Sequence, residues 1–167
     1  IHEQNAVAGM TNRILAKFAT TVMTAFPGAF PTEVKVKQTG NPLRESIIDI
    51  YYQPQTGIPN DRRIKLLVLG GSLGAMGLNT GIPAAMGKIE NSLQPEIWHQ
   101  TGKNKVEETE AAYRLHGVDA KISAFISDMA EAYQWADFVI CRAGALTISE
   151  LCTVGLGAIL VPYPFAV

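Results

Sequence analysis

The chain has 167 residues, which suits one domain or one domain with part of a neighbour, and its hydrophobic fraction of 47% is ample for a packed core. A formal net charge of -1, with 17% charged residues, gives no broad basic field and argues against nucleic-acid binding. No segment approaches the roughly 18 apolar residues of a membrane span, and no signal sequence opens the chain. These features predict a soluble, cytoplasmic domain that binds small molecules.

The cysteines and the chain ends add two further expectations. Cys141 and Cys152 make neither a disulfide framework nor a metal cluster, and their apolar neighbours predict two buried thiols in a reducing compartment. The chain starts at Ile1 rather than at a methionine and stops at Val167, just after an apolar run. We therefore expect it to be an internal piece of a longer protein.

The first third of the chain predicts one helix and two short strands. Apolar residues recur at helical spacing over residues 6–18, and short strands are predicted over residues 20–26 and 34–39. Residues 51–63 are rich in Gln, Pro, Gly and Asp and show no apolar period. That composition predicts a connection between two units.

From residue 64 onward, predicted strands and helices alternate. The strands cover residues 64–69, 96–100, 121–125, 138–141 and 158–161. The helices include one directly after the first of these strands, one over residues 105–116, a short one ending at Tyr133 and one over residues 147–154. Apolar strands separated by helices form a parallel sheet covered on both faces, and right-handed crossovers bring the carboxyl ends of the strands to one edge. The fold class is therefore α/β, with the ligand site expected at that edge.

A glycine-rich turn, Gly-Gly-Ser-Leu-Gly-Ala at residues 70–75, joins a predicted buried strand to a helix. Glycines let the backbone approach a ligand closely, and the first helical N–H groups with the Ser72 hydroxyl suit an anion such as a diphosphate. A tight turn without any ligand explains this motif alone equally well. The turn matches neither the dinucleotide fingerprint nor the nucleoside triphosphate loop.

A second glycine-containing loop, residues 142–150, also follows a predicted strand and opens a helix. In a purely structural interpretation, Thr147 is the N-cap and forms a capping box with Glu150. In a functional interpretation, the loop faces the same edge as Ser72, and Glu150 projects from the first helical turn to accept hydrogen bonds from a ribose diol. Two such loops in one sheet favour a nucleotide with a diphosphate.

Other polar residues allow more than one interpretation. The cluster from His2 to Asn5 is either a helix cap or a group that binds hydroxyls and transfers protons. Arg44 is either a surface charge or a phosphate clamp. His99 and His116 lack metal-ligand spacing and are interpreted as ordinary polar or capping residues. No Asp-x-Asp pair occurs, so no divalent ion is expected at the diphosphate and no cofactor is expected.

Six motifs occur in the order found in one enzyme family. They are HEQN at residues 2–5, AFPGAF at 25–30, GNPLR at 40–44, GGS at 70–72, WHQTG at 98–102 and CRAGALTISE at 141–150. Together they resemble the MurG family, peripheral membrane transferases that add N-acetylglucosamine to lipid-linked N-acetylmuramoyl pentapeptide. The resemblance implies the two-domain GT-B fold, with the nucleotide sugar in the cleft between the domains. Residues 1–43 would be the C-terminal part of the N-terminal (acceptor) domain, and residues 44–167 the UDP-GlcNAc-binding domain, truncated at its C-terminus.

The resemblance also implies roles for individual residues. His2 would be catalytic, and the residues that would bind UDP-N-acetylglucosamine are Asn5 at the sugar, Arg44 and Ser72 at the diphosphate, Ile126 at uracil through its backbone, and Ala145, Leu146, Thr147, Ile148, Ser149 and Glu150 at phosphate and ribose. Two positions depart from the family pattern: Leu73 stands where Gln is frequent, and Gly157 replaces a common Pro or Lys.

The implied reaction is an inverting, metal-independent transfer from UDP-N-acetylglucosamine to lipid I, which makes lipid II. The implied location is the cytoplasmic face of the bacterial inner membrane, reached through the part of the N-terminal domain that this chain lacks. Two alternatives stay open: a non-catalytic nucleotide-sugar-binding subunit of a split transferase, and a 2-epimerase-like enzyme acting on the free nucleotide sugar.

Overall fold

The computed structural model describes residues 1–51, 62–71 and 74–163. The chain forms two compact units: Ile1–Arg44 with Gly144–Glu150, and Glu45–Ala143 with Leu151–Val167. The assignment of residues 1–43 to an N-terminal acceptor domain stays a prediction.

The first unit contains a small parallel sheet with strand order β1-β2-β3. Its strands are β1 (His2–Glu3), β2 (Val22–Thr24) and β3 (Val36–Gln38), and helix α1 (Met10–Leu15) connects β1 to β2. A core of Ala8, Val22, Ala29 and Phe30 packs beside the sheet. The two predicted strands are confirmed in shorter form, whereas β1 was not predicted because two residues carry no periodic pattern.

Helix α1 is much shorter than the predicted helix over residues 6–18. The Glu3 carboxylate accepts hydrogen bonds from the backbone N–H groups of Asn5 and Gly9 and so folds the intervening residues into a loop. The helix then begins after Gly9, which has an extended backbone and makes no side-chain cap. The interpretation of Asn5 as the helix cap is therefore wrong.

The second unit is a five-stranded, fully parallel sheet with order β6-β5-β4-β7-β8. Its strands are β4 (Lys65–Leu69), β5 (Glu96–Gln100), β6 (Lys121–Ser123), β7 (Phe138–Arg142) and β8 (Gly157–Val161). Its helices are α2 (Glu45–Tyr51), α3 (Met76–Met86), α4 (Val106–Leu115), α5 (Met129–Trp135) and α6 (Ala145–Val154), the last of which starts within the residues grouped with the first unit.

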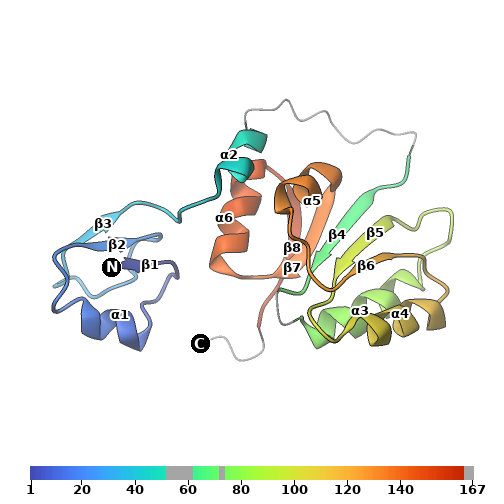
Figure 1. Ribbon diagram of the computed structural model, residues 1–167, viewed down its shortest axis with the longest axis horizontal. Coiled ribbons are helices and arrows are strands. Elements are labelled where there is room, and N and C mark those ends of the chain that lie inside the picture. Colours follow the sequence, from blue (N-terminus) through green and yellow to red (C-terminus); the bar gives the residue numbers. More distant parts are fainter. Residues whose placement is uncertain (52–61, 72–73, 164–167) are drawn as a thin grey trace. The chain divides into compact units, whose positions relative to one another are not determined.

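Helices cover both faces of this sheet, as predicted for an α/β fold (Figure 1). On one face, α3 and α4 pack through Leu78, Ile82 and Tyr113. On the other face, α2 and α5 pack together with the carboxyl half of α6, which contributes Leu151 and Val154. The predicted strands and helices of this unit are all confirmed, with shifts of a few residues at their ends.

Helix α2 is an element that the sequence interpretation missed. Its side chains Ile47 and Ile50 lie three residues apart and are 0% and 1% exposed, so one helical face is fully buried. The pattern is too short to be distinguished from an irregular apolar segment. Residues 52–61 of the predicted connection lie outside the described residues.

Two predictions about side-chain burial need correction. Cys141 is buried in β7, and burial raises the pKa of its thiol to about 11. Cys152 is exposed, because it lies on α6 beside Leu151, whose side chain faces the sheet. His99 is not an ordinary polar residue: it is fully buried in β5, its Nδ1 lies 3.0 Å from the hydroxyl of Tyr113, and burial lowers its pKa to about 4.

Candidate functional site

The predicted site loops follow two neighbouring strands in the middle of the sheet. Strand β4 pairs with β7, and Leu69 lies opposite Cys141 at their carboxyl ends. The chain leaves β4 through α3 on one face and leaves β7 through α6, whose carboxyl half packs on the other face. This is a topological switch point, where open α/β sheets bind ligands outside the carboxyl ends of their strands.

The turn after β4 depends on its glycines. Gly71 and Gly74 have φ values of +79° and +76°, in the left-handed region. A Cβ on Gly74 would collide with the carbonyl of Thr101, and a Cβ on Gly70 would lie 2.9 Å from the backbone nitrogen of Ala75. Ala75 is the N-cap of α3 and provides no side-chain hydrogen bond to the first turn of this helix. Ser72 and Leu73 lie outside the described residues.

The loop after β7 leads directly into α6. The first backbone bond of this helix is from Ile148 N–H to the carbonyl of Gly144, at 2.9 Å. The N–H groups of the three preceding residues, Ala145, Leu146 and Thr147, therefore have no intrahelical acceptor. Three donors at the positive end of a helix suit a phosphate group, and phosphate binding at these positions stays a prediction.

The helix start corrects two details of the sequence interpretation. Thr147 is the third residue of α6 rather than its N-cap, so the capping box with Glu150 does not apply. Glu150 is the sixth residue and lies in the second turn, not the first. The Ser149 hydroxyl donates to the carbonyl of Ala145 at 2.9 Å, which secures the first turn.

Ile126, the predicted uracil partner, lies in the loop between β6 and α5. Its backbone N–H donates to the side-chain oxygen of Gln100 at 2.9 Å, and both residues are buried. The backbone of this loop is held at two more points, since Thr101 N–H donates to Ser123 O and Gly102 N–H donates to Ala124 O. Gln100 was not among the predicted site residues.

His2, the predicted catalytic residue, is anchored within the first unit. Its Nε2 lies 3.0 Å from the carbonyl oxygen of Gly40, which can only accept, so Nε2 carries the proton. In this arrangement Nδ1 holds the lone pair and is the atom able to take a proton. A cavity of about 300 Å³ adjoins His2. Its other lining residues are Met23, Thr39, Gly40, Asn41 and Pro42.

A buried carboxylate supports this end of the first unit. Glu3 is 2% exposed, and Oε1 accepts from the N–H and the amide of Asn5, while Oε2 accepts from Gly9 N–H and the Asn12 amide. Burial alone would raise the pKa of this carboxyl, but the hydrogen bonds outweigh it and hold the pKa below its ordinary value. The Asn12 amide also donates to His2 O, which ties His2 and Asn5 into one network.

Two arginines bring positive charge to the two units. Arg44, a predicted diphosphate contact, is exposed and forms no ion pair with any described residue. Arg142, which the sequence interpretation did not select, is the last residue of β7 and donates to the carbonyl of Pro162 at 2.7 Å. A Cβ built on Gly77 would lie 3.7 Å from its Nη2, so this guanidinium reaches the first turn of α3. Its signal in the sequence was its place as the first residue of the second predicted loop.

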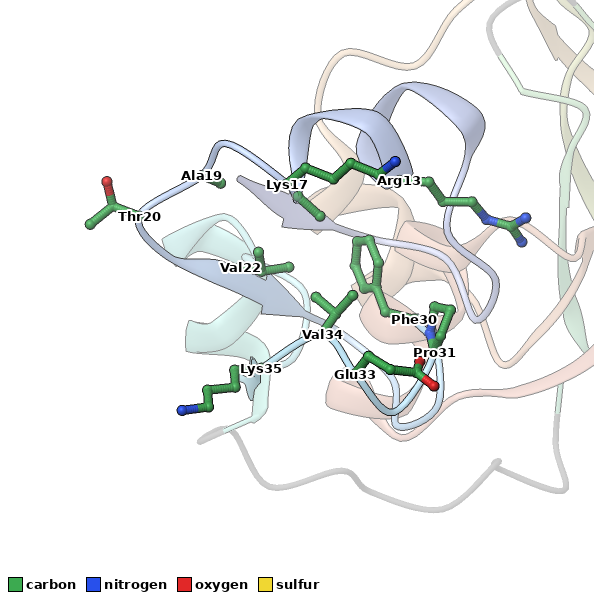
Figure 2. Close-up of a pocket in the computed structure, with 11 residues that line it drawn as sticks. Arg13, Lys17, Ala19, Thr20, Val22, Phe30, Pro31, Glu33, Val34 and Lys35 are labelled. Atoms are coloured by element: carbon green, nitrogen blue, oxygen red, sulfur yellow. The ribbon is translucent and has the colours of Figure 1, made fainter.

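A separate cavity of about 540 Å³ in the first unit contains none of the predicted site residues (Figure 2). It lies between α1 and the segment after Phe30 and is lined by apolar side chains with Arg13, Lys17, Glu33 and Lys35 among them. Among residues 1–51, 62–71 and 74–163, no group of three His, Cys or acidic side chains is placed to hold a metal ion. In the same ranges, no helix has the length and apolar character needed to cross a membrane.

Comparison with known proteins identifies the family. The model of the glycosyltransferase family 28 C-terminal domain matches residues 65–167, which include the whole five-stranded sheet. The chain belongs to glycosyltransferase family 28. Its resemblance to the MurG family, inferred from six motifs, is confirmed by family 28 relatives that are similar over the whole chain.

Two of these relatives carry the name UDP-N-acetylglucosamine–N-acetylmuramyl-(pentapeptide) pyrophosphoryl-undecaprenol N-acetylglucosamine transferase. The protein from Marinobacter nauticus is 50% identical over 167 residues, and the protein from Pseudomonas savastanoi pv. phaseolicola is 51% identical over 168 residues. In both cases the match covers 100% of this chain and 46% of the relative. The chain thus spans about half the length of the family 28 proteins it matches.

Solved structures agree with the predicted GT-B fold class. The crystal structure of Acinetobacter baumannii MurG matches with a TM-score of 0.73 and 42% identity, covering 100% of this chain and 46% of that one. The glycosyltransferase SnogD from Streptomyces nogalater matches with a TM-score of 0.51 and 16% identity, covering 88% of this chain and 40% of that one. The second match supports the fold alone, and together they confirm the fold class of this family 28 chain.

Proposed function

We propose that the protein containing this chain transfers N-acetylglucosamine from UDP-N-acetylglucosamine to the 4-hydroxyl of lipid-linked N-acetylmuramoyl pentapeptide, converting lipid I to lipid II. The observation that carries the proposal is the pairing of β4 with β7, which brings two strand-ending turns to one edge of the sheet. Each turn opens a helix, so backbone donors and helix dipoles at this edge suit a diphosphate. The names of the relatives supply the choice of sugar and acceptor.

In this proposal the residues of the switch point bind the uridine diphosphate. The N–H groups of Ala145, Leu146 and Thr147 donate to phosphate oxygens, and Glu150 accepts from the ribose hydroxyls. Ser72 and Arg44 complete the diphosphate contacts, as the family resemblance implies. Further roles follow from the same resemblance. Ile126 contacts uracil through its backbone, Ile148 and Ser149 contact phosphate and ribose, and Asn5 contacts the donor sugar.

The proposed reaction is a single inverting displacement without a metal ion. The acceptor 4-hydroxyl gives its proton to Nδ1 of His2, and its oxygen forms a bond to the anomeric carbon of N-acetylglucosamine. The bond from that carbon to the diphosphate oxygen breaks at the same time. The released uridine diphosphate carries the developing negative charge, which backbone N–H groups, helix dipoles and Arg44 stabilise.

We propose that the protein works at the cytoplasmic face of the inner membrane as a peripheral enzyme, because its acceptor carries an undecaprenyl chain. Exposed apolar side chains on α1 and directly after it, including Met10, Ile14 and Phe18, support contact with an apolar phase. Phe18 is 82% exposed, which is unusual for so large an apolar side chain.

The test is a transfer assay on the complete gene product with radiolabelled UDP-N-acetylglucosamine and a lipid I analogue. Glu150→Ala should raise the KM for the donor roughly ten- to hundredfold, since a hydrogen bond to a charged group contributes about 1.5–3 kcal/mol. Glu108→Ala, at an exposed position on α4, is the matched control and should leave KM unchanged.

Three outcomes would contradict the proposal. An unchanged donor KM in Glu150→Ala would remove Glu150 from the site. Turnover of the free nucleotide sugar without any acceptor would favour the 2-epimerase-like enzyme. Activity that appears only when a separate protein is added would favour the nucleotide-binding subunit of a split transferase.

A further inference from the structure

The peptide between Gly40 and Asn41 holds the side chain of His2. His2 Nε2 donates to the carbonyl oxygen of this peptide at 3.0 Å, so the orientation of the peptide decides where Nδ1 points. Gly40 gives little control over that orientation, because its φ is +75° and a glycine moves readily between conformations. Apart from its chain neighbours, no atom lies within 4 Å of the place where a Cβ on Gly40 would stand. The peptide must therefore be held from its other end.

Asn41 fixes the other end of this peptide. Its Nδ2 donates to the carbonyl of Gln4 at 3.2 Å and to the hydroxyl of Ser149 at 3.1 Å. The Gln4 carbonyl can only accept, so the side-chain nitrogen of Asn41, and not its oxygen, must face it. Pro42 follows directly and restricts the backbone of Asn41 to extended conformations. Two side-chain partners and a restricted backbone thus hold Asn41 in place.

The two partners of Asn41 belong to the two segments that carry the proposed chemistry. Gln4 directly follows β1, the strand that bears His2. Ser149 lies in α6, and its hydroxyl donates to the carbonyl of Ala145, the first residue of this helix, at 2.9 Å. All of these residues belong to the first unit. One amide side chain therefore connects the segment of the base to the helix start that is proposed to bind the diphosphate.

We propose that Asn41 is a positioning residue for the transfer reaction, because it holds the Gly40–Asn41 peptide and thereby keeps Nδ1 of His2 directed at the acceptor hydroxyl. This inference rests on the proposed function, since it takes His2 as the base. A displacement of about 1 Å can lower a rate on the order of a hundredfold, so the loss of Asn41 should lower kcat. The donor contacts of α6 are backbone N–H groups that the substitution keeps, so the KM for the donor should not follow.

The experiment measures kcat and the donor KM of the complete gene product in the transfer assay. Asn41→Ala should lower kcat at least about tenfold and leave the donor KM within about threefold of the wild-type value. Asn41→Asp keeps the size of the side chain but places an acceptor oxygen opposite the Gln4 carbonyl, so it should lower kcat to the same extent. Lys37→Ala, at an exposed position on β3, is the control and should leave both constants unchanged.

A double-mutant cycle with His2→Ala separates positioning of the base from a general effect on the fold. If Asn41 acts through His2, Asn41→Ala should change the kcat of His2→Ala by less than about twofold, although it lowers the kcat of the wild type about tenfold. A further loss of about tenfold in His2→Ala would mean that Asn41 acts on the fold or directly on a substrate, and it would overturn the inference. Should Asn41→Ala not fold, Asn41→Asp replaces it in the same cycle.

The results also separate this inference from the proposed function. If Asn41→Ala keeps the wild-type kcat within about twofold, the inference is overturned while the proposed transfer reaction stands. If His2→Ala keeps the wild-type kcat, His2 is not the base, and the inference fails together with that role. If the wild-type protein transfers no N-acetylglucosamine, the inference and the proposed function both fail.

Discussion

The substitution Glu3→Gln tests how the first unit holds His2 and Asn5 in place. The carboxylate receives four hydrogen bonds, two at each oxygen, at 2.9–3.1 Å. Gln keeps one acceptor oxygen and therefore loses two of these bonds. Its NH₂ group would then face the Gly9 N–H and the Asn12 amide, which are themselves donors.

Each lost partner of a buried group costs about 1–3 kcal/mol. The lower end applies here, because Gly9 is exposed and Asn12 is only half-buried, so water can replace part of the loss. We expect the free energy of unfolding to fall by about 2 kcal/mol, which corresponds to a decrease in Tm of roughly 4–8 °C for a chain of 167 residues. Thermal unfolding followed by circular dichroism measures it, with the exposed Glu33→Gln in the same unit as control.

The pH dependence gives the same prediction a second readout. The pKa of Glu3 in the folded protein lies below its ordinary value of 4.5. Glu3 therefore makes its full contribution to the free energy of unfolding above pH 4.5, and this contribution is lost as the pH falls through the folded pKa. The difference in Tm between wild type and Glu3→Gln should therefore narrow in acid. Equal Tm values at neutral pH, or a difference that grows in acid, would refute the reasoning.

Two further substitutions test the second unit. Gly74→Ala should prevent folding or destabilise the protein by more than about 3 kcal/mol, because φ at this residue is positive and the new Cβ meets the carbonyl of Thr101. The control Gly81→Ala, at an exposed and open position of α3, should stabilise the protein by about 0.5–1 kcal/mol. Equal urea midpoints for the two variants would contradict this prediction. Stability should also fall by about 3 kcal/mol between pH 6.5 and 4, because His99 is buried with a pKa of about 4 and protonates first in the unfolded chain. In His99→Gln, the free energy of unfolding measured by urea denaturation should change less between about pH 6.5 and 4 than it does in the wild type. The same pH dependence in both proteins would contradict the low pKa of His99.

The sequence was sufficient to predict the five strands of the second unit and four of its helices, because its central strands β4, β5 and β7 are largely buried and the sequences of β4 and β7 are apolar runs. Glycines at 71 and 74 marked the turn after β4 correctly, since positive φ angles favour this residue. The register of β4 with β7, by contrast, pairs residues that are 72 positions apart along the chain, as Leu69 with Cys141, and no local pattern predicts it.

The errors lie where side chains compete with the backbone. The helix predicted over residues 6–18 lost its first turn because the Glu3 carboxylate accepts from the N–H groups of Asn5 and Gly9 and so holds residues 5–9 in a loop. The N-cap at Thr147 was wrong because α6 begins two residues earlier, at Ala145. Gln100 was overlooked because a single amide within a strand has no sequence signature.

We propose above that two helix N-termini and one carboxylate at the carboxyl edge of the sheet hold a uridine diphosphate group. Calorimetric titration of the complete gene product with UDP and with ADP tests it most directly. We expect saturable binding of UDP that is at least about tenfold tighter than that of ADP, and a smaller difference between the two nucleotides in Glu150→Ala. Equal affinity for the two nucleotides, or no binding of UDP, would contradict it.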